Sequence, residues 1–401
     1  MSKKNRKWLV FTIMCLAYMP GSYAQYQLAV YAPELIQSFG LTTSQFSSLF
    51  TAPMIVAIFL SFVGGMISDK VGSKKVINIS FVIAGIGMIG RVFANSYMPF
   101  FLCMALTGFS NMFVNINASK ITASWFEQEK LGILMGIFAF CGQLPGAFAT
   151  ATTAVLFDSR TSAFIVSAIF CISVFVLWLL FVKDKPEDTM EEREKIDQEN
   201  QPSIGDSLKV VLSNKGIWLV SICIMMALGS TVTLSTFMPM ALQTMYGIDL
   251  KVCGTIASML TLGNCIGSIT GPIVFSKIKN VKVFVSGAAV LSFAGIIMCW
   301  RFPSIFVLHI LVLYTGIMLG ASMPIFFSAP VLLEGIGTKY AGSAAGVIST
   351  LQLLGAVLIP TYILTPIAGD NYSLLFMLAS ICMVIMFLCG LLLPQFGNNQ
   401  K

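Results

Sequence analysis

The chain has 401 residues, of which 57% are hydrophobic and 10% are charged, and its formal net charge is +7. A soluble domain carries about 25% charged residues, so this composition excludes a water-soluble globular protein. It indicates a protein whose helices are surrounded by lipid.

Twelve apolar segments follow one another along the chain, each long enough to cross a bilayer as a helix of ~20 residues. They span residues 8–31, 43–66, 76–95, 98–122, 131–155, 162–182, 217–243, 252–276, 283–300, 304–328, 342–366 and 372–393. The first resembles a signal peptide as far as Ala24, but its apolar run continues to Tyr31. We therefore predict an all-α membrane protein with twelve transmembrane helices.

The basic residues lie mainly on one side of these spans. With a cytoplasmic N-terminus, 20 of the 24 Lys and Arg residues fall on the cytoplasmic side. The four outer ones are Arg91, Arg160, Lys251 and Arg301. This bias follows the positive-inside rule and places both termini in the cytoplasm of a cell-membrane protein. It accounts for the net charge without a nucleic-acid partner.

The longest polar stretch, 183–216, divides six spans from six. We predict a bundle at 1–182, a cytoplasmic linker at 183–216 with a helix near 187–199, and a second bundle at 217–401. The halves resemble each other in order: "FGLTTSQ" (39–45) matches "YGIDLKV" (246–252), and "AGIGMIGR" (84–91) matches "AGIIMCWR" (294–301). Two duplicated halves are a transporter architecture, with the substrate between them near the midplane of the membrane.

The short loop "GMISDKVGSKK" (65–75) joins spans two and three. It resembles the Gly-x-x-x-Asp-Arg/Lys-x-Gly-x-Arg/Lys-Arg/Lys loop of the major facilitator superfamily. The matching residues are Gly65, Asp69, Lys70, Gly72, Lys74 and Lys75. The resemblance implies two pseudo-symmetric six-helix bundles, alternating access, and a gating latch that keeps the cytoplasmic side shut while the outer side is open. The alternative is that the lysines only set the topology.

Polar side chains inside lipid are costly, so their positions are informative. The predicted substrate-binding residues lie near the centres of spans one, four, five, seven, eight, ten and eleven. They are Gln25, Tyr26, Asn111, Asn115, Gln143, Thr233, Asn264, Tyr314 and Gln352. In the family that this chain resembles, these spans line or flank the cavity. The alternative for each residue is a hydrogen bond between helices.

Arg91 and Arg301 occupy matching places in the two halves, and the length of the span after Lys75 puts Arg91 near the outer surface. We predict that they are vestibule cations that attract anions; the alternative is anchoring or pairing between the halves. Acidic residues are missing from the centre of every span. This favours facilitated diffusion or exchange, or coupling through another group. The only histidine, His309, is expected to have a structural role near the outer interface.

The sequence therefore predicts a secondary active or facilitative transporter of a small solute. We favour a small organic anion on three grounds: the two predicted vestibule cations, the lack of acidic residues at the centres of the spans, and the resemblance of the segment 31–50 to anion carriers of the oxalate–formate, nitrate and cyanate type. A neutral solute, drug efflux and a transporter-like membrane sensor remain alternatives. The protein is expected to be a monomer with no enzymatic activity, no cofactor and no metal site. The ten cysteines do not form CxxC.

Overall fold

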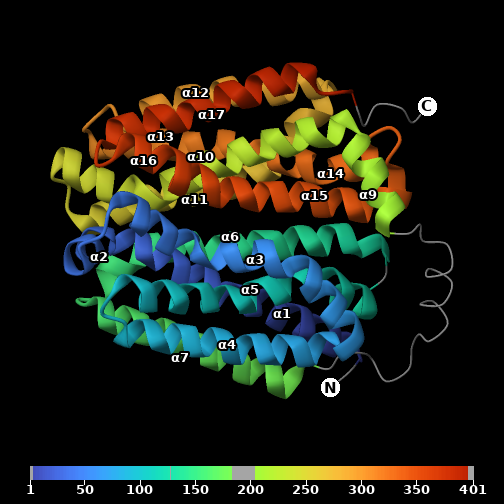
Figure 1. Ribbon diagram of the computed structural model, residues 1–401, viewed down its shortest axis with the longest axis horizontal. Helices are drawn as coiled ribbons and strands as arrows, with labels where there is room; N and C mark the ends of the chain where they lie inside the picture. Colours follow the sequence, from blue (N-terminus) through green and yellow to red (C-terminus); the bar gives the residue numbers. More distant parts are fainter. Residues whose placement is uncertain (1–2, 127, 183–203, 396–401) are drawn as a thin grey trace. The chain divides into compact units, whose positions relative to one another are not determined.

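The computed structural model describes residues 3–126, 128–182 and 204–395, and every regular element in these ranges is helical (Figure 1). The elements are, in chain order, α1 (Lys3–Val30), α2 (Ala32–Phe39), α3 (Thr43–Val71), α4 (Ser73–Phe93), α5 (Tyr97–Trp125), α6 (Gln128–Leu156), α7 (Arg160–Phe181), α9 (Ile204–Ser213), α10 (Lys215–Tyr246), α11 (Leu250–Ile278), α12 (Val281–Met298), α13 (Ile305–Ala321), α14 (Met323–Leu332), α15 (Gly337–Leu358), η1 (Ile359–Leu364), α16 (Thr365–Ala368) and α17 (Tyr372–Leu392).

The helices follow the predicted spans to within a few residues. Among the described residues, ten helical stretches are long and apolar enough to cross a membrane. The other two predicted spans correspond to α1 and α6, which are 28 and 29 residues long. Two spans are subdivided: span ten into α13 and α14, and span eleven into α15, the π-helical turn η1 and α16. The prediction of an all-helical membrane protein is confirmed.

Helix ends follow local sequence rules, and two of them reflect the duplication. Thr42 caps α3 in a capping box with Gln45, in which each side chain bonds the other residue's backbone N–H. Gly40 and Gly247, which correspond in the two repeats, have φ angles of 62° and 64°. Glycine adopts this left-handed conformation at no steric cost. The same turn chemistry therefore recurs at the matched positions.

The chain forms two compact units. The first contains Met1–Thr189 together with Met238–Ser258, and the second contains Met190–Phe237 together with Met259–Lys401. The predicted division at 1–182 and 217–401 instead assigns α10 and α11 wholly to the second half. The division of the chain into two repeats at these bounds stays a prediction.

The predicted linker ends in a helix, since α9 occupies part of the range 183–216. Asn214 lies between α9 and α10 (Lys215–Tyr246); its side chain donates to the Glu334 carbonyl at 3.0 Å and caps the start of α10 by accepting from the Gly216 N–H at 2.9 Å. The helix predicted near 187–199 lies outside the described residues.

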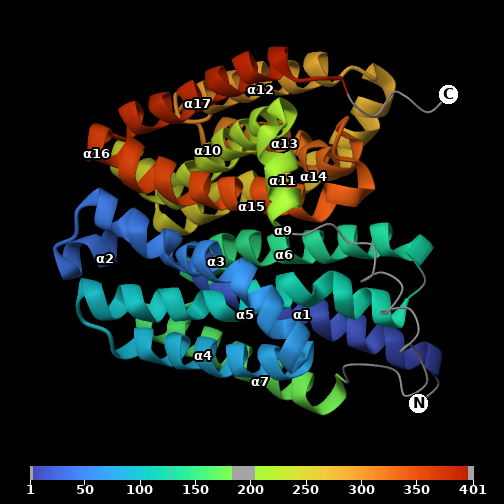
Figure 2. The same cartoon turned by 45° about the vertical axis from the view of Figure 1, so that its right-hand side comes forward.

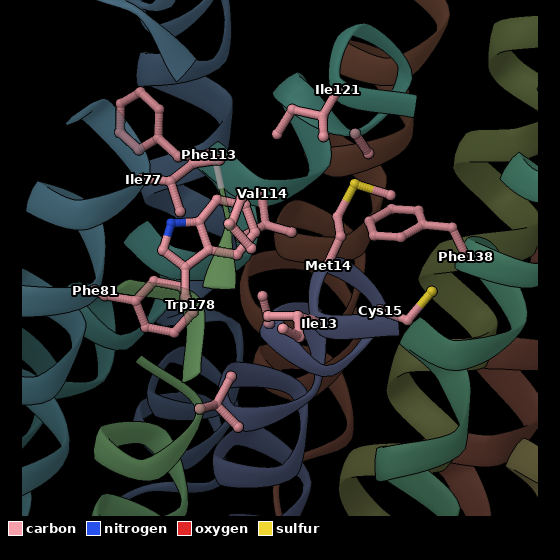
Figure 3. Close-up of a cluster of buried hydrophobic side chains, with 14 of the residues drawn as sticks. Ile13, Met14, Cys15, Ile77, Phe81, Phe113, Val114, Ile121, Phe138 and Trp178 are labelled. Carbon is pink, nitrogen blue, oxygen red and sulfur yellow. The ribbon is translucent and has the colours of Figure 1, made fainter. Parts of the chain in front are cut away.

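In the first unit, α1 packs against α5, α6 and α7, and α4 lies beside α5 and α7 (Figure 1). Figure 3 shows the buried apolar cluster that these helices share, with Met14 from α1, Val114 from α5, Phe138 from α6 and Trp178 from α7. Lipid is as apolar as these side chains, so their stabilisation comes from close van der Waals packing rather than from exclusion of water.

In the second unit, α12 and α17 lie side by side (Figure 2). Glycines spaced four residues apart bring α11 and α13 into backbone contact. A Cβ on Gly267 would lie 2.2 Å from the Ile317 carbonyl oxygen, and one on Gly316 would lie 2.2 Å from the Leu260 carbonyl oxygen. Glycine is required where the backbones of two membrane helices approach this closely.

Candidate substrate-binding site

The polar face of α1 is held by its neighbours in the first unit. Gln25 is buried, and its Nε2 donates to the Phe50 carbonyl of α3 at 2.9 Å. Tyr26 packs edge-on against the Phe50 ring with 5.5 Å between ring centroids. Two predicted site residues thus lie where α1 meets α3, and packing fixes both.

Asn111 of α5 reaches the same face of α1. With its amide nitrogen donating to the Tyr18 carbonyl at 3.1 Å, its oxygen accepts from the hydroxyl and the backbone N–H of Ser22 at 3.0 and 3.1 Å. This amide orientation satisfies both ends of the side chain. We call Ser22, Gln25, Tyr26 and Asn111 the polar cluster.

Two glycines of α6 make room for the aromatic rings of α1. A Cβ on Gly142 would lie 2.0 Å from Cε1 of Tyr18, and one on Gly146 would lie 3.1 Å from the Tyr26 ring. The Tyr18 ring also packs against Phe138, with 4.9 Å between centroids. The two glycines therefore leave space for Tyr18, which lies beside the polar cluster, and for Tyr26, which belongs to it.

Two further predicted residues of the first unit are exposed. They are Asn115, one turn beyond Asn111 on α5, and Gln143, next to Gly142 on α6. Their amides are accessible, so a role in binding solute stays a prediction for both.

In the second unit, two of the predicted side chains bond within the protein. The Thr233 hydroxyl donates to the Gly229 carbonyl of its own helix at 2.8 Å. The Tyr314 hydroxyl donates to the Leu291 carbonyl of α12 at 3.4 Å. Asn264 of α11 and Gln352 of α15 are half-buried. Substrate binding by these residues stays a prediction.

Arg91 does not face an outer vestibule, because only 1% of it is exposed. Nη1 donates to the Ala24 carbonyl at 2.8 Å, and Nη2 donates to Oε1 of Gln27 at 2.9 Å and to the Ser167 hydroxyl. The guanidinium also lies over the Phe164 ring, 4.3 Å from its centroid. The prediction of an exposed cation at this position is wrong.

The error concerns the face of the helix rather than the depth. The buried side of α4 includes Ala84, Gly87, Met88 and Arg91, whose spacing of three and four residues defines one face. Residue counting from Lys75 gives a height along the helix and says nothing about rotation. The face of α4 turns Arg91 toward α1 and α7.

Sequence reasoning also missed Gln27 and Ser167, the side-chain partners of Arg91. Gln27 is fully buried, and its Nε2 donates to the Ala163 carbonyl of α7 at 3.2 Å. An arginine on the apolar face of a membrane helix needs polar partners on neighbouring helices. That requirement, applied to Arg91, is the signal that leads to Gln27.

Arg301, the repeat partner of Arg91, is exposed and lies over the Trp300 ring, 5.4 Å from its centroid. It differs because α12 ends at Met298, whereas α4 continues beyond Arg91 to Phe93. In the helix that follows, Nδ1 of His309 lies 2.8 Å from the Ile305 carbonyl oxygen of the first turn.

The loop between α3 and α4 is built on Gly72. Its φ of 94° and ψ of 138° suit glycine, and its N–H closes α3 on the Ser68 carbonyl at 3.1 Å. Lys74 is half-buried and Lys75 is exposed. Gly65 and the side chains of Asp69 and Lys70 lie outside the described part of the structure. The latch therefore stays a prediction.

Comparison with known proteins gives consistent relatives. The sequence profile of the Major Facilitator Superfamily matches residues 10–360. The "Probable sulfoacetate transporter SauU" of Cupriavidus necator is 23% identical over 364 residues, which cover 85% of this chain and 83% of that protein. The "Galacturonate transporter" of Dickeya chrysanthemi is 23% identical over 309 residues, covering 74% and 90%.

Two further matches bear on function and fold. The "Membrane sensor protein UhpC" of Salmonella typhimurium is 23% identical over 379 residues, covering 88% of this chain and 83% of that protein. A crystal structure of a bacterial homologue of the human lysosomal transporter Spinster, inward-facing and unoccupied, has a TM-score of 0.76 at 13% identity. It covers 98% of this chain and 95% of that one. Because the family profile spans most of the chain and the fold agrees, the chain belongs to the Major Facilitator Superfamily of membrane transporters and is not an enzyme.

Proposed function

We propose that this transporter carries small organic anions across the cytoplasmic membrane by alternating access, acting as a monomer with both termini in the cytoplasm. The observation that carries the anion proposal is the similarity to proteins named for sulfoacetate and galacturonate, which are both organic anions. The polar cluster supports it, since the Gln25 and Asn111 amides each carry a second N–H beyond the one described above, and an amide N–H can donate a hydrogen bond to a carboxylate.

The charge distribution agrees with an anionic solute. The acidic residues of the chain lie at the ends of spans or between them, as do Glu34, Asp158, Asp249 and Asp370. A carboxylate crossing between the bundles therefore meets no like charge at mid-membrane, where it would be least screened.

Purified protein in liposomes tests the proposal. We expect uptake of labelled sulfoacetate or galacturonate above that of protein-free liposomes, and faster uptake when the same unlabelled anion is loaded inside. Galactose serves as the neutral counterpart of galacturonate. Uptake of galactose with neither anion taken up would replace the proposal with a neutral-solute carrier.

A sensor function is the second candidate, because UhpC is named as a membrane sensor and matches 88% of this chain. The same preparation separates the two candidates. A sensor binds the anion, seen as a rise in melting temperature by mass action, without accelerating its flux. Binding without flux would favour the sensor.

A further inference from the structure

Arg91 carries a buried charge that the described residues do not neutralise. All of its contacts are neutral: the Ala24 carbonyl, the Gln27 amide, the Ser167 hydroxyl, the Met104 sulfur and the face of Phe164. No described carboxylate lies within ion-pair distance of it.

A buried charge normally has a counter-ion, because burial of an unpaired charge is expensive. Arginine is effectively always protonated, so the net positive charge stays in the interior of the first unit. One of its donors, Nε, is buried without a hydrogen-bond partner. Neutral dipoles hold the guanidinium in place, and its field extends beyond them.

The polar cluster lies across α1 from this charge. At 100° per residue, Ala24 and Gln27 lie on one side of α1, and Ser22, Gln25 and Tyr26 lie on the other. The width of a helix with its side chains is about 10 Å, which sets the separation. No described helix comes between α1 and Arg91, because Arg91 bonds α1 directly.

We propose that Arg91 determines specificity for anionic solutes from behind α1, through its charge and without touching the solute. The proposal rests on the proposed function, because it assigns the solute to the polar cluster. A unit charge about 10 Å away, at an effective dielectric constant of about 20, changes the affinity for a monoanion roughly tenfold. A neutral solute of the same size gains nothing.

A purely structural role for Arg91 is the competing explanation, because its hydrogen bonds also fix α1 against α4 and α7. The two roles separate when charge and hydrogen bonding change independently. Arg91→Lys keeps the charge and loses the planar fork of donors. Gln27→Glu keeps Arg91 in place and supplies the missing counter-charge. Arg91→Gln removes the charge.

A carboxylate introduced into the polar cluster reports the field without any substrate. In Asn111→Asp, we follow the carboxyl infrared band as the difference from the same protein with Asn111 in place. The pH midpoint of this band gives the proton affinity of the introduced carboxylate. We expect the midpoint to rise by about one pH unit, a tenfold change in proton affinity, when Arg91→Gln or Gln27→Glu is added. Arg91→Lys should leave it in place, as should Ser167→Ala, which removes one hydrogen bond and no charge.

Two outcomes of the infrared titration overturn the proposal. In one, the midpoint stays put in both charge-neutralising variants, so the field does not reach the cluster. In the other, Arg91→Lys and Ser167→Ala shift it as far as Arg91→Gln does, so geometry is responsible. Gln27→Glu keeps the test valid if Arg91→Gln does not fold.

A transport readout links the field to selectivity. We expect the affinity of galacturonate relative to galactose, measured in liposomes, to fall about tenfold in Arg91→Gln and Gln27→Glu and to hold in Arg91→Lys. An unchanged ratio overturns the proposal. If the parent protein moves neither solute, the proposed function fails while the infrared titration still decides the role of Arg91.

Discussion

At the scale of single residues, small side chains decide where large ones can sit. Gly142 is the clearest case, because the Tyr18 ring occupies the space where any other side chain would begin. The Tyr18 ring also packs against Phe138, one turn before Gly142 on α6, and the Tyr18 backbone carbonyl accepts from the Asn111 amide. A methyl group at residue 142 therefore acts on the polar cluster through Tyr18.

Gly142→Ala should destabilise the protein by about 1–3 kcal/mol through overpacking, seen as a lower melting temperature in detergent. Gly85→Ala is the matched control, since nothing lies within 4 Å of a Cβ at that helical position. The control should be neutral or slightly stabilising, because alanine favours helix over glycine. Equal melting temperatures for the two variants would show that Tyr18 yields at no cost.

At the scale of elements, the turn between α3 and α4 is anchored from a third helix. Asn117 of α5 donates to the Ser68 hydroxyl at 3.0 Å and to the Phe113 carbonyl at 2.8 Å, so the end of α3 is tied to α5. Gly72 then reverses the chain within one residue. The turn that follows the predicted latch residue Asp69 is thus tied to α5 through Ser68.

Asp69→Asn should slow transport severalfold while the amount of protein in the membrane is unchanged, because an amide lacks the charge that favours a helix N-terminus or a lysine partner. Ser276→Asn is the control, since Ser276 takes the place of Asp69 in the second repeat and carries no charge. Initial rates of uptake into liposomes measure both variants. Equal rates for Asp69→Asn and the parent protein would remove the gating role.

At the scale of the whole molecule, the exposed side chains indicate that the protein is surrounded by lipid. Large apolar side chains are exposed on the helices of spans three, six, nine and twelve, for example Ile86 on α4, Leu180 on α7, Val283 on α12 and Leu392 on α17. Exposed apolar surface on this scale is stable only in lipid. The basic residues that flank these spans predict which end faces the cytoplasm.

Fusions to reporter enzymes test that orientation. Alkaline phosphatase joined after Ser159, between α6 and α7, should be active because it is exported. The same enzyme joined after Asn280, between α11 and α12, should be inactive. A fluorescent protein at the C-terminus should fluoresce in the cytoplasm. The opposite pattern would invert the topology and place the loop of Gly72 outside the cell.

The sequence predicted the spans well and the site only partly, for physical reasons. Long apolar runs and turn residues such as Gly40 and Gly247 specify helices locally. The pairing of Asn111 with Ser22 depends on how α5 lies against α1, which no local pattern contains. For Arg91, the number of residues after Lys75 predicts how deep the side chain lies in the membrane, and the buried stripe of α4 predicts which way it points. Our prediction rested on the depth alone.

The π-helical turn η1 has a consequence for reading span eleven. A π turn takes in one residue more than an α turn, so side chains after Leu364 are advanced by about 100° relative to those before Ile359. A helical wheel drawn through the whole span is therefore out of phase in its outer part. The inner part places Gly355 against Met225 of α10, while α16 contacts α17. Losing one residue within η1 would restore a continuous α-helix and swing that outer part away from α17.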